Sequence, residues 1–367
     1  MKVEVCCIFN LAPHYRAPIY KLMDEELQCD FYFGDKVDTP IKQMEYQSLV
    51  GFKKILNNVN IGNTAYMWQK GAIGLIFKKY EKYIITGDVN VLSNWAILIL
   101  AIILKKDVFA WTHGMRDGRS KKRTLFEKTF FRLCKKVLLY GNYSKDIMLK
   151  NGFKDEKLIP IYNSLDYAKQ LLIRSTLKET KIFNDHFHNN LPNVIYIGRI
   201  QKSKKLNLLV EAIERLNNNK RVCNLIFIGK DIGDNDVVKK VNTLKLLDAV
   251  WFYGPCYDEK EIGNLIFNST VCVSPGPVGL TALHSLTYGT PVISNNNFAY
   301  QMPEFETIKE GQTGAFFEND NLDSLTQTIH EWISISKEKR EIIRKNCYEV
   351  IDAKWNPNYQ IQVLKSL

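Results

Sequence analysis

Apolar and polar positions along the chain predict two successive α/β domains. In the first half, short β-branched and aromatic runs indicate buried parallel strands. Stretches with helical periodicity lie between several of these runs, and this alternation is typical of a doubly wound sheet. We expect the strands at 3–10, 31–34, 83–87, 108–112, 137–141 and 158–162.

The same pattern starts again after a polar stretch. Residues 176–190 include the run NDHFHNN, have few apolar positions and are typical of a linker. Beyond them we expect strands at 194–198, 223–229, 250–254 and 271–274, and helices at 206–217, 236–246, 259–268 and 322–333.

These elements predict a domain plan. We expect an N-terminal Rossmann-like domain over 1–175, a linker over 176–190 and a C-terminal Rossmann-like domain over 191–345. A C-terminal helix at 346–367 is expected to pack back on the first domain. Two doubly wound domains that face a central cleft usually bind a ligand in it, at the carboxyl ends of their strands.

One apolar run is long enough to raise the question of a membrane-inserted helix. Residues 95–104 are all apolar and are followed by Lys105 and Lys106. The run is too short to span a bilayer. We favour a core helix, with a membrane-inserted helix as the alternative.

Composition, the start of the chain and the cysteine content indicate the class of protein. The chain has 367 residues, of which 46% are hydrophobic and 24% charged, as in a soluble globular protein. Lys2 is followed directly by a strand-like run, so we expect no signal peptide. Eight scattered cysteines without metal-type spacing are expected to be free thiols in a reducing cytoplasm.

The net charge of +11 lies entirely in the first half. Residues 1–175 contain 28 Lys and Arg against 17 Asp and Glu, whereas residues 176–367 contain 22 of each. This asymmetry indicates an anionic partner such as a membrane face or a lipid diphosphate, or else a merely soluble basic domain. No RNA- or DNA-binding module is recognisable, so we do not expect nucleic acid.

A basic helix is predicted within residues 119–136, which contain eight Lys and Arg against one acid. Its apolar side either packs into the domain core or seats the protein on the anionic inner leaflet of the plasma membrane. The apolar side is formed by Leu125, Phe126, Thr129, Phe130 and Leu133.

Two segments of the second half are candidates for an anion site. Arg199 and Lys204 follow the strand at 194–198 and precede a helix, where backbone N–H groups and the helix dipole add to their charge; solvated loop charges are the alternative. In SPGPVGLTALHSLTYGTPVISN, residues 274–295, a second helix begins at Gly279. Its first N–H groups, those of Gly279, Leu280 and Thr281, are placed to bind a phosphate.

The first half offers polar side chains at strand ends. His113 follows the strand at 108–112, and His14 and Arg16 follow the first strand. A lone histidine is more often structural than catalytic, but its place before Gly114 favours a functional role. No residues have the spacing of a metal site, so we expect no metal.

The segment VIYIGRIQKSKKLNLLVEAIERL resembles the phosphate-binding segment of the GT-B-fold glycosyltransferases of family four, also called glycosyltransferases group 1. LIFIGKD, VWFYG, VGLTALHSLTYGTPVIS and PEFETIKEGQTGAFF continue the series in the family's order. YRAPIY and WTHG resemble the family's first domain more weakly. The resemblance covers most of residues 1–335.

This resemblance implies transfer of a sugar, with retention, from a nucleotide-diphosphate donor to a glycan or lipid-linked glycan in bacterial surface polysaccharide synthesis. It implies a diphosphate site at Arg199, Lys204 and Gly279, and no cofactor beyond the nucleotide sugar. It places His113 at the donor sugar, Glu304 at the sugar or ribose, and His14 and Arg16 on the acceptor side. A sugar-nucleotide epimerase or an inactive partner subunit of the same fold remains as an alternative.

The sequence departs from the family at one motif. The family carries two glutamates eight residues apart, one for the sugar and one for the ribose, and these positions are Gly276 and His284 here. An imidazole can still hydrogen-bond ribose hydroxyls. A glycine offers only its backbone. We therefore expect a working but divergent site with intact phosphate binding, and a degenerate, inactive site is the alternative.

Overall fold

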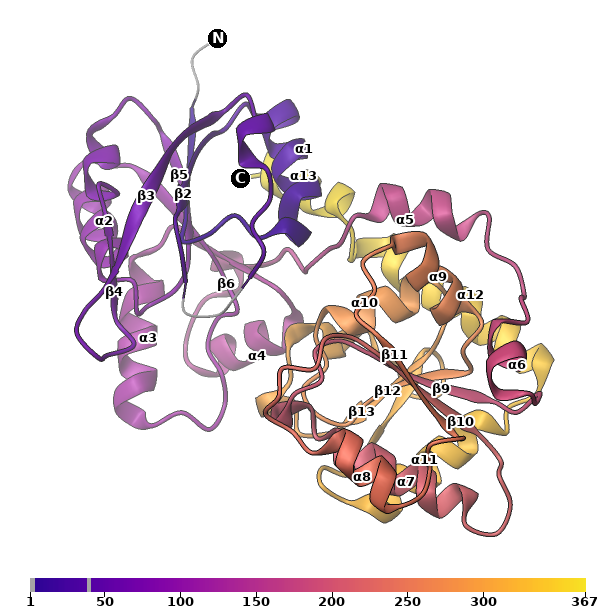
Figure 1. The fold of residues 1–367 in the computed structure, drawn as a ribbon. Helices are drawn as coiled ribbons and strands as arrows, with labels where there is room; N and C mark the ends of the chain where they lie inside the picture. The colour runs from indigo at the N-terminus through magenta and orange to yellow at the C-terminus, as the bar shows by residue number, and fades with distance from the viewer. Residues whose placement is uncertain (1–3, 38–40) are drawn as a thin grey trace. The chain divides into compact units, whose positions relative to one another are not determined.

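The computed structural model describes residues 4–37 and 41–367, and the chain divides into two compact units. The first contains Met1–Asp166 together with Asn356–Leu367, and the second contains Tyr167–Trp355. Each unit is a mixed α/β structure around a sheet that is wholly or mostly parallel, with helices on both faces (Figure 1). Two Rossmann-like units are therefore present, as the hydrophobic pattern predicts.

The first unit has an eight-stranded sheet in the order β4-β3-β2-β1-β5-β6-β7-β8. Neighbouring strands are parallel except β3 and β4, which are antiparallel. The sequence pattern did not predict this pair. The strands are β1 Val5–Phe9, β2 Asp30–Gly34, β3 Phe52–Asn60, β4 Met67–Lys70, β5 Lys82–Thr86, β6 Asp107–Thr112, β7 Lys136–Leu139 and β8 Leu158–Pro160.

Two hydrophobic cores lie on the opposite faces of this sheet, because successive side chains of a strand point to opposite sides. Cys6 and Ile8 of β1 belong to the core under α2, α3 and α4, whereas Cys7 and Phe9 belong to the core under α1 and α13. The helices are α1 Ala17–Leu27, α2 Leu92–Ile103, α3 Lys121–Leu133, α4 Asn142–Lys150 and α13 Pro357–Lys365, and the short 3-10 turns are η1 His14–Arg16, η2 Tyr46–Ser48, η3 Ile73–Phe77 and η4 Asp155–Lys157.

Helix α2 is only partly a core helix. Ile97, Leu98 and Ala101 are buried, whereas Ile102 and Ile103 are exposed. The expectation of a simple core helix holds for one face of α2 only. No helix within residues 4–37 and 41–367 is long and apolar enough to cross a membrane.

The second unit has a six-stranded, fully parallel sheet in the order β11-β10-β9-β12-β13-β14. Numbered within the unit, this is the Rossmann order 3-2-1-4-5-6. The strands are β9 Asn193–Ile197, β10 Asn224–Ile228, β11 Val250–Gly254, β12 Val271–Ser274, β13 Val292–Asn295 and β14 Gly314–Phe317.

Helices of the second unit form where the apolar period is close to 3.6. In α7, Leu206, Leu209, Val210 and Ile213 are buried on one face. The helices are α5 Tyr167–Arg174, α6 Ile182–Phe187, α7 Leu206–Asn217, α8 Val237–Thr243, α9 Glu259–Phe267, α10 Leu280–Thr287, α11 Leu322–Ile333 and α12 Lys337–Lys354, with 3-10 turns η5 Lys202–Lys204, η6 Phe298–Tyr300 and η7 Pro303–Thr307.

The division between the units differs in detail from the predicted domain plan. It falls after Asp166, so α5 belongs to the second unit, and the expected linker at 176–190 contains α6. The expected single helix at 346–367 is two helices. The helix is interrupted at Trp355. The Asn356 side chain caps α13 by accepting a hydrogen bond from the N–H of Tyr359 at 2.9 Å. Helix α13 packs against α1 of the first unit.

Candidate active site

In the second unit, the strand order reverses between β9 and β12, which are neighbours in the sheet. Loops that follow two such strands leave in opposite directions and form a crevice, the usual ligand site of an open parallel sheet. The loop after β9 carries Arg199 and Lys204. The loop after β12 carries Gly276 and leads to Gly279, the N-cap of α10.

Arg199 and Lys204 form a cation pair beside this crevice. Arg199 is exposed and Lys204 is half-buried. Burial, and next the positive charge of Arg199, lower the pKa of Lys204 to about 8, while Glu304 opposes the shift. The ammonium of Lys204 donates a hydrogen bond to the carbonyl of Pro277, in the loop after β12. Lys204 is therefore an amine whose charge is costly without an anion nearby.

The N-terminus of α10 points donors at the same region. The N–H of Ala282 bonds to Gly279, but the N–H groups of Gly279, Leu280 and Thr281 have no acceptor among the described residues. The Thr281 hydroxyl donates to the carbonyl of Ile197 at 2.8 Å and so ties α10 to the end of β9. Free N–H groups at a helix start, with the dipole behind them, favour an anion.

Gly276 is a glycine for a packing reason. A Cβ at this position would lie 2.7 Å from the Cα of Lys204 and closer still to the carbonyl oxygen of Ser203. Its N–H donates to the carbonyl of Lys204 at 3.0 Å, so this N–H is not available to a ligand. No glutamate side chain fits here without moving the loop after β9.

His284, at the position of the second family glutamate, lies against a carboxylate. Its Nε2 is 3.5 Å from Oε1 of Glu259 at the start of α9. That oxygen also accepts hydrogen bonds from the Tyr288 hydroxyl and the Gln170 amide, each at 2.8 Å. Burial lowers the pKa of His284, and Glu259 partly offsets this effect. His284 therefore presents a neutral ring with a carboxylate behind it.

Gln301 holds the loop that precedes α10. Its carbonyl oxygen accepts the N–H of Val278 at 2.7 Å, and its amide donates to Ser294 and to the carbonyl of Asn295. Gln301 is 5% exposed, and Glu304 in η7 is 2% exposed. Glu304 is thus a buried group of this loop region that acts electrostatically on Lys204.

The first unit has a cavity of about 490 Å³ at the carboxyl ends of β1, β5 and β6. The order of its sheet also reverses next to β1, which lies between β2 and β5. His113 lines the cavity, and its Nδ1 is buried with no hydrogen-bond partner. Burial, with Arg116 and Arg16 nearby, lowers the pKa of His113 to about 3. His113 is therefore neutral at working pH and does not act there as a proton donor of imidazolium type.

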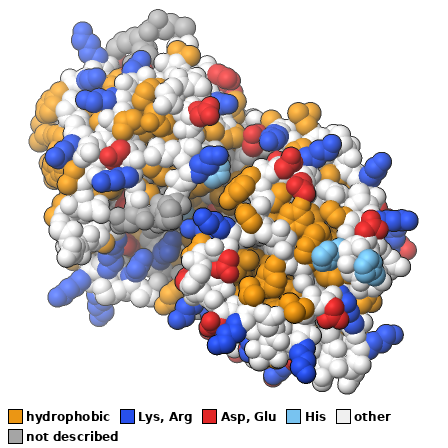
Figure 2. Space-filling model, viewed as in Figure 1, with side chains coloured by type: hydrophobic (Ala, Val, Ile, Leu, Met, Phe, Trp, Pro, Cys, Tyr) orange, Lys and Arg blue, Asp and Glu red, His pale blue; other side chains and the backbone are white. Residues whose placement is uncertain are grey.

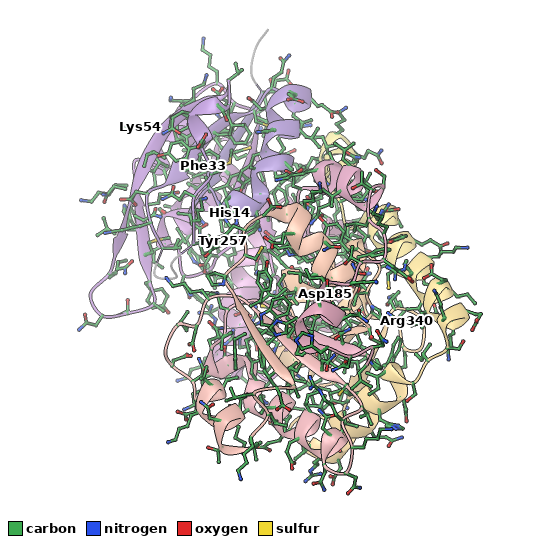
Figure 3. The ribbon with its side chains drawn as sticks, turned by 45° about the vertical axis from the view of Figure 1, so that its right-hand side comes forward. His14, Phe33, Lys54, Asp185, Tyr257 and Arg340 are labelled. Atoms are coloured by element: carbon green, nitrogen blue, oxygen red, sulfur yellow. The ribbon has the colours of Figure 1, made fainter. Side chains whose placement is uncertain are left out.

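Of the two candidate residues in the loop after β1, Arg16 and His14, only Arg16 lines the cavity. Arg16 lines the cavity, with its guanidinium 5.2 Å from the Trp111 ring centroid and 5.0 Å from that of Tyr140. His14, which is labelled in Figure 3, is exposed. Its Nδ1 lies 3.2 Å from the carbonyl oxygen of Lys42. His14 does not line the cavity.

Residues 178–350 match the family described as Glycosyl transferases group 1. This part of the chain is a glycosyltransferase group 1 domain. The chain is 24% identical over 277 residues to an uncharacterized 41.2 kDa protein in the cps region of Klebsiella pneumoniae, covering 72% of this chain and 71% of that one.

Solved structures show the GT-B fold for this chain. A glycosyltransferase from Rickettsia africae has a TM-score of 0.76 at 16% identity, covering 100% of this chain and 98% of that one. Anabaena HepE in complex with UDP has a TM-score of 0.73 at 15% identity, covering 99% of both chains. The apo lipopolysaccharide outer core galactosyltransferase WaaB has a TM-score of 0.70 at 16% identity, covering 99% of this chain and 100% of that one.

Sequence reasoning missed several residues of the candidate site. Glu259 begins α9, where an acidic residue normally only favours the helix N-terminus. Gln301 lies in a polar stretch without periodicity, and Arg116 lines the first-unit cavity. The roles of Glu259 and Gln301 depend on contacts between segments far apart in the chain, so no local pattern indicates them. Arg116 does have a local signal, because it lies three positions after His113.

Proposed function

We propose that the enzyme transfers a sugar, with retention, from a nucleotide-diphosphate donor whose diphosphate binds at Arg199, Lys204 and the N-terminus of α10. The observation that carries this proposal is the convergence of two cations and three N–H groups without acceptors on the crevice between β9 and β12. Each of these groups favours an anion, and together they match a diphosphate.

The same groups would assist the chemistry. As the glycosidic bond to the donor breaks, negative charge grows on the leaving diphosphate, and preorganised cations and N–H groups stabilise it. We propose that they do so without a metal ion. Anabaena HepE was solved with UDP, UDP-glucose and UDP with glucose, which supports a UDP-sugar as the donor of this chain.

His113 and His284 are proposed to bind the sugar and the ribose of the donor. A neutral imidazole can donate with one nitrogen and accept with the other. We place His113 at a hydroxyl of the reacting sugar and His284 at the ribose, with Glu259 fixing the orientation of the His284 ring. Glu304 is proposed to act through Lys204, because it is buried and favours the charged form of that amine.

The proposed acceptor is a glycan or lipid-linked glycan used in bacterial surface polysaccharide synthesis. The relative in a cps region and the structural similarity to a lipopolysaccharide galactosyltransferase support this class. We assign the acceptor to the first unit. This unit has a cavity of its own at the carboxyl ends of its strands, separate from the sheet that carries the proposed donor site.

An anionic membrane is the proposed location of that acceptor, and α2 is the element that would meet it. Ile99, Ile102 and Ile103 share one face of α2 and are 52%, 57% and 69% exposed. Figure 2 shows hydrophobic side chains gathered at the left edge of the first unit, where Figure 1 places α2. Lys105 lies two positions after the end of α2, and such an apolar face with a basic neighbour suits an anionic bilayer surface.

Helix α3 contributes less to this surface than its sequence indicates. Phe130 belongs to the core, and Phe126 and Leu133 pack against it. Leu125 remains 64% exposed. The apolar side of α3 is therefore mostly used inside the unit, and its proposed role is to supply exposed cations such as Lys121 and Lys122.

A radiolabelled-donor assay tests the proposed function. Purified protein is incubated with UDP-, GDP- and dTDP-sugars and a lipid extract of bacterial envelopes, and products are separated by extraction and chromatography. Label in the lipid or glycan fraction supports transfer. An epimerised donor would show the epimerase alternative, and unchanged donor with every extract would indicate an inactive subunit.

A further inference from the structure

The cavity of the first unit is more positively charged than a neutral sugar requires. Its lining includes four arginines, Arg16, Arg116, Arg119 and Arg123, against two carboxylates, Asp88 and Glu127. His113 is neutral because burial lowers its pKa to about 3. Among the described residues, the charged side chains that line this cavity therefore sum to a net charge of about +2 near neutral pH.

The carboxylates do not neutralise all four arginines. Glu127 is engaged by Arg123, whose Nε donates to it at 2.8 Å, and Nη1 of Arg123 donates to Asn90 at 2.8 Å. Asp88 accepts the N–H of Asn90 at 2.9 Å in its own turn. Among the described residues, no carboxylate forms an ion pair with Arg116 or Arg119.

Further donors in the cavity wall have no acceptor. Nε of Arg16 and Nε1 of Trp111 are buried without a hydrogen-bond partner, and Trp111 is 2% exposed. The guanidinium of Arg16 is held over the Trp111 and Tyr140 rings, so its position is fixed before any ligand binds. A buried donor without an acceptor is unfavourable, so this wall suits a ligand rich in acceptor oxygens.

We propose that this cavity binds a doubly charged phosphoryl group carried by the acceptor, either the diphosphate of a lipid carrier or a phosphate on the glycan. This inference rests on the proposed function, since it names the chemistry of its acceptor. A phosphate monoester carries a charge of about −1.5 to −2 at pH 7, and a diphosphate diester carries one charge on each phosphate. Either matches the excess of the cavity, whereas one carboxylate supplies half of it. Arginine also suits phosphate because its planar fork donates two parallel hydrogen bonds.

The test measures anion binding by isothermal titration calorimetry in a parent protein that carries Arg199→Ala and Lys204→Ala. These changes disable the proposed donor site, so that pyrophosphate bound there does not contribute. The probes are inorganic pyrophosphate, farnesyl diphosphate and glucuronic acid. The cavity variant adds Arg116→Gln and Arg119→Gln, and Arg119→Gln alone serves if the pair unfolds the protein. The matched control adds Arg132→Gln and Lys150→Gln, which remove the same charge from exposed positions of the same unit outside the cavity.

We expect pyrophosphate and farnesyl diphosphate to bind the parent, to bind the cavity variant at least tenfold more weakly, and to bind the control within twofold of the parent. Tighter binding of farnesyl diphosphate than of pyrophosphate would assign the lipid carrier, and equal binding would assign a phosphate on the glycan. The inference is overturned if the cavity variant binds as the parent does, if neither phosphate probe binds, or if glucuronic acid binds as tightly. Failure of the donor site is a separate result, because it appears as unchanged nucleotide binding when Arg199 and Lys204 are replaced.

Discussion

The N–H of Gly276 donates a hydrogen bond to the carbonyl of Lys204 at 3.0 Å, and this contact joins the two loops that carry the diphosphate site. The glycine is thus a requirement of the fold at this point. It accounts for the absence of the glutamate that the family resemblance leads us to expect here, because a side chain at 276 meets the backbone of the loop after β9.

Restoring the family's glutamate is therefore expected to harm the enzyme. Gly276→Glu and Gly276→Ala both force the loops apart, and overpacking of this kind typically costs about 1–3 kcal/mol. We expect a lower Tm in thermal unfolding and at least a tenfold loss of donor affinity. Gly279→Ala is the matched control for stability, because a methyl there meets nothing closer than Met302 Cγ at 3.7 Å. Higher activity in Gly276→Glu would contradict this account.

A second prediction concerns His284 and Glu259, whose side chains are 3.5 Å apart. His284→Ala should mainly raise the donor KM. His284→Glu should do the same, because it places two carboxylates side by side. Adding Glu259→Gln should recover donor affinity by at least fivefold, since it removes that repulsion. Steady-state kinetics of the two single variants and the double variant complete the cycle. Additive effects would show that Glu259 does not act on this position.

The pH dependence of donor binding follows from Lys204. The pKa of Lys204 in the free protein is lowered to about 8, so the amine is charged below this pH and loses its proton as the pH rises through it. Binding an anion favours the charged amine. Donor Kd should therefore rise as the pH increases from 8, by at most about tenfold per pH unit for one linked proton. Lys204→Ala should bind weakly at every pH and show no such step. A donor Kd that is constant from pH 7 to 9.5 in the unaltered protein would remove Lys204 from the site.

Membrane binding is predicted to depend on α2. Ile102→Glu with Ile103→Glu should release the protein from anionic vesicles in co-sedimentation, because two charges then replace apolar side chains at the lipid surface. Ile342→Glu, at a position 60% exposed in the second unit, is the control and should leave binding unchanged. Binding to the unaltered protein should fall with added salt and be weak with neutral vesicles. Equal binding of all three proteins would assign the exposed isoleucines another role.

Local patterns in the sequence predict much of this fold. The apolar face of α7 has a clear helical period, and residues 206–217 are helical as predicted. Strand β3 was missed because it is mostly polar, with Lys53, Lys54 and Asn57 exposed, so its pairing and not its side chains defines it. The break between α12 and α13 was also missed, although Pro357 after Asn356 is a recognisable helix start.

Some residues of the candidate site could likewise be predicted from the sequence, whereas others could not. Arg199, Lys204 and Gly279 could be found because each follows a strand or begins a helix, and parallel strands bring such positions to one edge of a sheet. Glu259 and Gln301 could not be found, because each acts on a residue more than 20 positions away in the chain. The charge excess near His113 was visible in the sequence, but its division between a cavity and an outer surface depends on the packing of α2 and α3.

The central claim is that Arg199, Lys204 and the start of α10 bind the diphosphate of the donor, and calorimetry with a nucleoside diphosphate tests it most directly. UDP and uridine are titrated into the unaltered protein and into the Arg199→Ala/Lys204→Ala variant, with the GDP and dTDP pairs measured in parallel. We predict that one diphosphate binds at least tenfold more tightly than its nucleoside, and that the variant loses this advantage while its affinity for the nucleoside is unchanged. Equal affinity of the two proteins for that diphosphate would contradict the account.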